Sequence, residues 1–308
     1  MVTITDFINV GLFAAAIRMA TPIIYASLGG MFSERVGIVN IGLEGVMLTS
    51  AFSGVVTSYY TGNPWLGVIA AVITGGIIAL IHAVLTIKYV GDQIVSGTGI
   101  NIMALGFTSY MTQIIWGNRG ASESVQGIPD ISIPIIKDLP VIGRVFGTHS
   151  PLVYLMPFVV YACYYILFKT PFGLRIRAVG EHPTAAETAG VDVIKIKYIG
   201  VILSGMLAGL GGAFLSLSHL NLFTRGMTGG RGFIAMAAMI FGKWMPFGVF
   251  SSGLLFGFAD ALQIRLQSLG ILPPQIILTL PYVLTVAILA GVVGKAVPPS
   301  DYKPYKKE

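Results

Sequence analysis

The sequence contains very little charge. Only 10% of its 308 residues are charged, 19 Lys or Arg and 13 Asp or Glu, whereas soluble domains carry about 25%. Residues 93–118, 198–224 and 266–294 contain no charge at all. Because about 20 apolar residues are enough for a helix to cross a bilayer, these stretches indicate a polytopic membrane protein. They exclude a soluble enzyme, a nucleic-acid-binding protein and a secreted domain.

Other absences narrow the possible functions. The single cysteine, Cys163, excludes an intramolecular disulfide and a cysteine-based metal cluster, and the four histidines lack metal-ligand spacing. No GxxxxGK[ST] phosphate loop occurs, so we expect the chain itself to bind no ATP and no other cofactor. The apolar spans contain neither a nucleophile paired with a base nor a pair of acids, since Glu44 is the only acid deep in a full span. The sequence therefore predicts no catalytic site.

The sequence does contain many long apolar stretches. A period-two alternation typical of membrane barrels is absent, so all are predicted to be helices, which satisfy their own backbone groups in lipid. We expect an all-α helical bundle forming one membrane domain over residues 1–308. Its seven predicted full spans are 7–31, 38–60, 65–87, 94–116, 151–168, 198–220 and 271–294.

Segment 234–260 differs, because Lys243 and Pro246 lie at its centre, where a charge and a proline both disfavour a continuous membrane helix. We expect two half-length helices meeting at residues 243–246, arranged either as a re-entrant hairpin or as two short, tilted spans. Counted as spans, they bring the total to eight or nine.

The basic residues predict the orientation. Five of them lie in 169–197 and three in the tail, at Lys303, Lys306 and Lys307, so both segments are expected in the cytoplasm. The N-terminus and the loop 117–150 are then external. This model also requires segment 234–260 to begin and end on the outer side.

Small residues repeat every four positions near the start of the last third of the chain. They are Gly200, Ser204, Ala208, Gly212 and Ser216. This spacing allows two helix backbones to approach closely. The stripe serves either internal packing or a face that lines a translocation path or subunit interface.

Polar residues occur inside the predicted spans. Asn40 and Glu44 share one helix face, and Gln93 and Asn101 share another, because each pair is four or eight residues apart. Glu44 either pairs with a partner such as Arg18 or lines the path of a polar substrate. The three amides act either as interhelical hydrogen-bonding groups or as part of the same translocation path.

Within the basic loop, Pro183 suits the first turn of a helix and Gly190 suits its end. The intervening residues favour a helix of about two turns, too short to span a membrane. Its small residues, Ala185 and Ala186, are expected to insert into a groove on another protein.

Three ordered blocks resemble the permease subunits of ATP-binding-cassette importers for simple sugars, nucleosides and branched-chain amino acids. They are residues 34–45 (ERVGIVNIGLEG), 173–186 (GLRIRAVGEHPTAA) and 230–242 (GRGFIAMAAMIFG). His182 departs from the family pattern, which has Asn there. The first block and the ending 295–299 (KAVPP) look most like the nucleoside, guanosine-type branch.

The resemblance implies a multi-pass subunit in a bacterial cell membrane that imports a small polar solute, most like a nucleoside. It implies a second, non-identical permease subunit, a cytoplasmic ATPase that binds the ATP, and an external substrate-binding protein or lipoprotein. The loop 173–190 would then contain the helix that couples the permease to the ATPase. The residues assigned to coupling are Arg175, Arg177, Gly180, Glu181, Pro183, Ala185, Ala186 and Gly190.

Two alternatives share these features. A sugar or another small solute would suit the same family, and a secondary transporter driven by an ion gradient would also have broken helices and a buried carboxylate. In the second case Glu44 would carry a proton or coordinate sodium.

Overall fold

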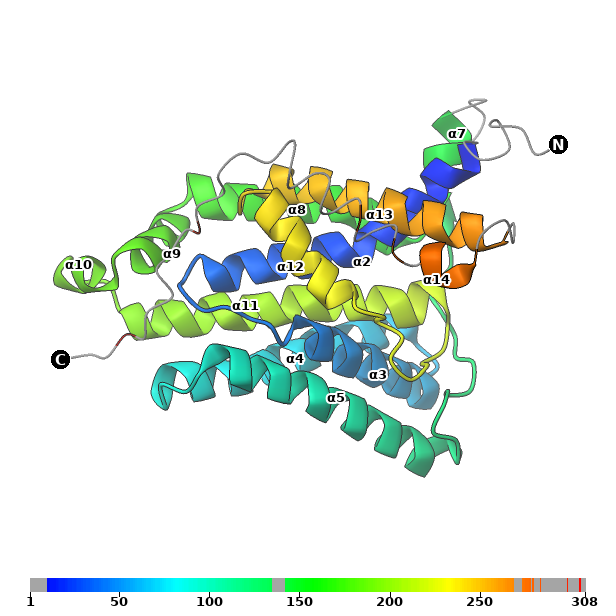
Figure 1. Ribbon diagram of the computed structural model, residues 1–308, viewed down its shortest axis with the longest axis horizontal. Helices are drawn as coiled ribbons and strands as arrows, with labels where there is room; N and C mark the ends of the chain where they lie inside the picture. The colour runs from blue at the N-terminus through cyan, green and yellow to red at the C-terminus, as the bar shows by residue number, and fades with distance from the viewer. Residues whose placement is uncertain are drawn as a thin grey trace.

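The computed structural model describes residues 10–134, 142–268 and 273–277, together with positions 279, 283, 298 and 305. Long helices lying side by side dominate this part of the chain (Figure 1). They are α2 (Val10–Glu34), α3 (Leu43–Thr61), α4 (Pro64–Ala83), α5 (Gln93–Trp116), α8 (Pro151–Lys169), α11 (Val193–Ala213) and α13 (Pro246–Ser268). The shorter ones are η1 (Val84–Lys88), α7 (Ile142–Phe146), α9 (Pro171–Glu181), α10 (Pro183–Thr188), η2 (Phe214–His219), α12 (Arg231–Phe241) and α14 (Pro274–Ile277).

Local sequence sets the ends of several helices. Gly62 ends α3 in the left-handed conformation, with φ at 66°, which glycine adopts without steric cost. The Asn63 side chain then caps α4 by accepting the backbone N–H of Trp65 at 3.0 Å. Asp92 caps α5 in the same way, and Ser150 caps α8. Each side chain satisfies a helix N–H group that has no partner within the helix.

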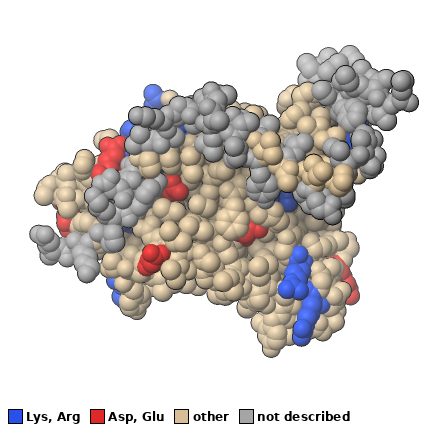
Figure 2. All heavy atoms as spheres, viewed as in Figure 1, with Lys and Arg blue, Asp and Glu red and all other residues tan. Residues whose placement is uncertain are grey.

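The predicted spans agree well with the helices. Six of the seven predicted full spans coincide with α2, α3, α4 with η1, α5, α8, and α11 with η2. The seventh, 271–294, lies largely outside the described residues. Within the described part, five helices are long and apolar enough to cross a membrane, namely α2, α4 with η1, α8, α11 with η2, and α13. Helices α3 and α5, which the sequence predicted as full spans, are not among these five. On the face shown in Figure 2, charged side chains over the middle of the bundle are few and isolated. The chain is therefore a polytopic helical membrane protein.

Helix α11 occupies the centre of the bundle and packs against α2, α3 and α4. Its small-residue stripe is buried, with Ser204, Ala208 and Ser216 fully inaccessible. A Cβ built on Gly205 would lie 2.2 Å from the carbonyl oxygen of Gly75 on α4. Of the two predicted roles for the stripe, internal packing is thus confirmed.

The chain breaks where predicted, because α12 ends at Phe241 and α13 begins at Pro246. The prediction of two half-length helices is wrong for the second helix, however. Helix α12 has 11 residues, whereas α13 has 23 and is long enough to span. The prediction ended the segment at Asp260, but this carboxylate pairs with Arg231 on α12, and α13 continues for two more turns.

The bundle has two distinct ends (Figure 1). Helices α9 and α10 lie at one, here called the α10 end, where Tyr305 donates a hydrogen bond to Glu187. Helix α7 lies at the other, the α7 end. The described part of the predicted loop 117–150 departs from an all-helical chain in the antiparallel strands β1 (Ile131–Ser132) and β2 (Thr148–His149). An isolated antiparallel bridge also pairs Ala121 with Thr224. Main-chain hydrogen bonds also join this loop to the segment that follows η2.

Candidate functional site

A non-helical segment, residues 35–42, joins α2 to α3 within the bundle. Residues 35–38 bond back to the end of α2, whereas side chains from neighbouring helices satisfy the backbone of the second half. Gln93 Oε1 accepts the N–H of Val39 at 2.7 Å, and His82 Nε2 donates to the Val39 carbonyl at 3.1 Å. Asn101 bridges the end of the segment, donating to the Ile41 carbonyl at 3.0 Å and accepting the Gly45 N–H at 2.7 Å. Irregular backbone is tolerated at membrane depth only when protein or water supplies such partners.

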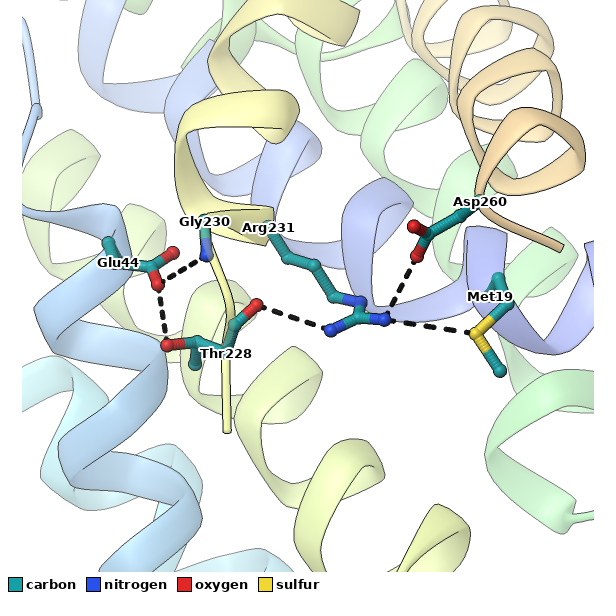
Figure 3. A network of polar contacts seen from close by, with 6 residues as sticks. All are labelled: Met19, Glu44, Thr228, Gly230, Arg231 and Asp260. Atoms are coloured by element: carbon teal, nitrogen blue, oxygen red, sulfur yellow. Dashed lines mark hydrogen bonds and ion pairs between the residues drawn. The ribbon is translucent and has the colours of Figure 1, made fainter. Parts of the chain in front are cut away.

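The carboxylate of Glu44, in the first turn of α3, binds the N-terminus of α12 (Figure 3). Oε1 accepts the Thr228 hydroxyl at 2.6 Å and the Gly230 N–H at 2.8 Å. Oε2 accepts the Gly232 N–H at 2.7 Å. Negative charge is favoured at a helix N-terminus, where backbone N–H groups lack helical partners. The hypothesis that Glu44 pairs with Arg18 is therefore wrong, because its partners in the described chain are these three donors.

An ion pair adjoins this cluster. Arg231, the first residue of α12, lies 2.9 Å from Asp260 of α13, and their side chains are 18% and 13% exposed. The other terminal nitrogen of Arg231 donates to the Thr228 carbonyl at 3.3 Å. Figure 3 shows the two clusters side by side, joined through residues 228–231. Charged groups thus hold helices α3, α12 and α13 together at the N-terminal end of α12.

The four residues predicted for the translocation path are brought together around residues 35–45, but in different environments. Gln93 and Asn101 form hydrogen bonds with the backbone of residues 39–45, in agreement with the prediction that these amides are interhelical hydrogen-bonding groups. Asn40 is only 2% exposed and donates to Ser204 Oγ at 3.2 Å. Glu44 is half-buried and thus reaches the surface of the chain. Glu44 is therefore better placed than Asn40 to meet a solute.

Sequence analysis missed several members of this site. They are His82, Thr228, Arg231 and Asp260. The Gly-Arg-Gly run at 230–232 was a usable signal, because glycine beside a charged residue at a helix start permits close backbone approach. A Cβ on Gly232 would lie 2.4 Å from the Glu44 nitrogen.

At the α10 end, the predicted short helix is confirmed as α10, and Gly190 follows it with φ at 82°. A second helix was missed: Thr170 caps α9, whose first residue is Pro171. A groove of about 560 Å³ runs between the two helices, lined by residues of both. Of the residues predicted for coupling, Arg175, Glu181, Ala185 and Gly190 are exposed, Arg177 and Pro183 are half-buried, and Gly180 and Ala186 are buried.

The expected surface position of Ala186 is wrong. This residue is 5% exposed and belongs to an apolar cluster with Ile176, Val179 and Val193. Helix α10 turns this side inward because it packs against α9 of its own chain. Ala185 and Ala189 remain exposed along the groove.

Arg35, which directly follows α2, connects this end to the broken helix. Its guanidinium donates twice to the Trp244 carbonyl, at 3.0 and 2.6 Å. Burial and, to a lesser extent, the positive charge of Arg177 lower the pKa of Arg35 to about 10, while Glu181 opposes the change. Arg35 is therefore still charged at neutral pH.

Packed helices, a helix broken near buried charges, and short helices projecting from one end together define a membrane transport component. Comparison with known proteins specifies which kind. Residues 12–292 match the family described as branched-chain amino acid transport system / permease component, and the chain belongs to that family. It is accordingly an integral membrane permease and not an enzyme.

The chain is similar to several named permeases. It is 41% identical over 304 residues to the guanosine ABC transporter permease protein NupQ of Bacillus subtilis, covering 95% of each chain. It is 40% identical over 290 residues to the nucleoside ABC transporter permease protein NupC of Lactococcus lactis, covering 91% of each. A putative glucose ABC transporter permease protein, TsgC13 of Haloferax volcanii, is 36% identical over 327 residues, covering 97% of this chain and 98% of that one.

A weaker similarity extends to NupP, a second guanosine ABC transporter permease protein of Bacillus subtilis, at 26% identity over 78% of this chain and 70% of that one. The same organism therefore has two permeases of this kind that carry the same substrate name. No solved structure matches the chain.

Proposed function

We propose that this chain is a permease subunit of an ATP-driven importer that carries nucleosides into the cell. The main support for this proposal is the similarity of the chain, over more than nine-tenths of its length, to permeases named for guanosine and nucleosides. Membership in an ATP-dependent permease family favours this mechanism over ion-coupled transport. The glucose-named relative makes a simple sugar the second candidate substrate.

The α10 end faces the cytoplasm in this proposal, and the ATPase subunit docks on α9 and α10. Basic residues at this end, among them Lys169, Arg175 and Lys195, support the assignment through the positive-inside rule. The exposed groove beside Ala185 and Ala189 offers small side chains to a partner. The loop 117–150 and the α7 end then face outward, toward a substrate-binding protein.

The path is proposed to run along the surface that carries Glu44, Arg231 and Asp260. Partly exposed charges at membrane depth are unfavourable in lipid and normally face protein or water. A second permease subunit covering this surface would keep it away from lipid, and the pair of guanosine permeases in one organism supports a two-permease assembly.

Glu44 is the residue we assign to solute contact. An ionised carboxylate has about four acceptor positions, and three of those on Glu44 are filled by Thr228, Gly230 and Gly232. We assign the remaining acceptor position, on Oε2, to the solute, because the Glu44 side chain is only half-buried. A ribose hydroxyl is a donor of suitable chemistry for this position.

The test is uptake by membrane vesicles that contain the complete importer. Labelled guanosine should accumulate only when ATP is supplied inside, and unlabelled adenosine should compete with it. An ionophore that removes the proton gradient at constant ATP should leave uptake unchanged. Competition by glucose but not by adenosine would favour the sugar candidate, and loss of uptake with the ionophore would contradict the ATP-driven mechanism.

A further inference from the structure

The four residues between α12 and α13, Gly242 to Met245, form a strained joint. Lys243 and Trp244 both have positive φ, 52° and 51°, in a region that non-glycine residues rarely occupy. The flanking glycines allow the two helices to touch, because a Cβ on Gly248 would lie 2.2 Å from the Gly242 carbonyl oxygen. Such backbone strain persists only where the surroundings hold it in place.

The surroundings hold Trp244 from two sides. Arg35 donates twice to its carbonyl, as described above, and its indole Nε1 donates to Glu34 Oε2 at 2.6 Å. Glu34, Arg35 and Trp244 are all at most 8% exposed. The end of α2 thus fixes the joint through buried, charge-assisted hydrogen bonds, which are short and directional.

Phe168, at the end of α8, is in contact with two guanidinium groups. Arg35 sits over its ring at 5.2 Å from the centroid, and Arg177 of α9 at 5.1 Å. Phe168 also stacks on Tyr164 at 5.5 Å, and Tyr164 contacts Phe247 at 5.0 Å in the first turn of α13. The ring therefore contacts Arg177 of α9 directly and reaches the joint through two neighbours, Arg35 and Tyr164.

Helix α12 carries the connection onward. The joint lies at its C-terminus, and Glu44 binds its N-terminus. Eleven helical residues extend roughly 16 Å, at about 1.5 Å per residue. A rotation at the joint would accordingly move the α12 N-terminus and the Glu44 cluster with it.

We propose that the stack Arg177–Phe168–Arg35 is the link that transmits a displacement of α9 to the strained joint, and through α12 to the Glu44 cluster. This inference rests on the proposed function, in which α9 and α10 receive the motion of the ATPase. Phe168 and Arg35 are positioning residues in this proposal, because they act through Arg177, Trp244 and α12. Two discrete arrangements of the joint would correspond to the two states of the permease.

Phe168→Leu tests the link in the reconstituted complete importer. Leucine keeps most of the apolar bulk but removes the ring face that attracts both cations. Stimulation of the ATPase by loaded binding protein should fall about fivefold or more, the lower range of typical coupling between sites. ATPase co-purification and unstimulated ATP hydrolysis should stay unchanged. Phe168→Tyr should restore stimulation, and Phe158→Leu, on the same helix at a site 72% exposed, should have no effect.

A double-mutant cycle measures the coupling between Arg177 and Phe168, which a simple loss of packing at either residue would not produce. If Arg177 acts through the ring, Arg177→Gln should lower stimulation alone but add little in the Phe168→Leu background. Additive effects would show that Arg177 acts by another route, and wild-type stimulation in Phe168→Leu would refute the link.

If Phe168→Leu fails to assemble, the exposed joint residue Lys243 supplies the test. Lys243→Gly relieves the backbone strain and should fold well, yet it should weaken stimulation more than Lys243→Ala does. Unchanged stimulation in both Lys243→Gly and Arg177→Gln would overturn the proposal. Failure of the proposed function looks different, because the wild-type complex itself would then show no stimulation by nucleoside-loaded binding protein.

Discussion

The Glu44 carboxylate accepts the backbone N–H of Gly232 at 2.7 Å, joining residues that are 188 positions apart in the sequence. The contact requires glycine, since any Cβ at 232 would collide with the backbone of Glu44. The first turn of α3 therefore lies directly against the first turn of α12. One carboxylate serves as the N-terminal cap of a helix that belongs to a different part of the chain.

Glu44→Gln should destabilise the permease. The neutral amide weakens the attraction to the α12 N-terminus, and its NH2 group cannot accept a backbone N–H. We expect a loss of about 1.5–3 kcal/mol, the usual range for hydrogen bonds to charged groups, measured as a lower midpoint of thermal unfolding in detergent. Exposed Glu123→Gln is the control, and equal midpoints for Glu44→Gln and wild type would contradict the capping role.

Gly75→Ala should be destabilising, whereas Gly99→Ala should not. A Cβ on Gly75 would lie 2.2 Å from the Gly205 carbonyl oxygen, but a Cβ on Gly99 meets nothing within 4 Å. Overpacking costs about 1–3 kcal/mol, and replacing an exposed helical glycine by alanine gains up to about 1 kcal/mol. Unfolding midpoints of the two variants should move in opposite directions. An unchanged midpoint in Gly75→Ala would show that α4 and α11 are not in close contact at this position.

Cysteine labelling checks the orientation. Cys163 is the only cysteine in the sequence, so Cys163→Ser, a replacement of similar size, provides a thiol-free background. In this background, Glu123→Cys should react with a membrane-impermeant maleimide added to intact cells. Thr188→Cys, exposed at the α10 end, should react only after the membrane is opened. The reverse pattern would place α9 and α10 outside the cell and remove the basis for ATPase docking.

The two neighbouring alanines of α10 should behave differently. Ala185→Trp adds bulk on the exposed groove, so the permease should fold normally but retain less ATPase during purification. Ala186→Trp adds the same bulk inside the chain's own apolar cluster, so it should lower the unfolding midpoint by overpacking. Normal ATPase recovery and full transport with Ala185→Trp would exclude this surface from docking.

Local signals predicted much of the architecture. Uncharged stretches of sufficient length located the helices, Pro246 located the break, and Pro183 with Gly190 bounded α10. Each of these features depends on neighbouring residues along the chain. The length of α13 was underestimated because segment 234–260 was divided at Lys243 and Pro246 and ended at position 260. The pairing of Asp260 with Arg231 could not be known from sequence alone.

The candidate site was predicted less completely, because it depends on partners that are distant in sequence. Gln93 and Asn101 were recognised as polar residues within a span, but nothing local indicated that they bind the backbone of residues 39–45. The inward orientation of Ala186 was missed for a related reason. A six-residue helix has too few positions to show which of its faces is apolar.

The support of residues 35–42 by later helices also affects how the protein is made. Gln93 follows its partner Val39 by 54 residues, and Asn101 follows Ile41 by 60. At about 5–20 residues per second, a ribosome needs roughly 3–12 s to add that length. During this interval α2 and α3 have already been synthesised, but the N–H of Val39 and the carbonyl of Ile41 lack their final hydrogen-bond partners. Nascent chains that stop before α5 therefore retain an unsatisfied backbone that the insertion machinery must keep hydrated or shielded.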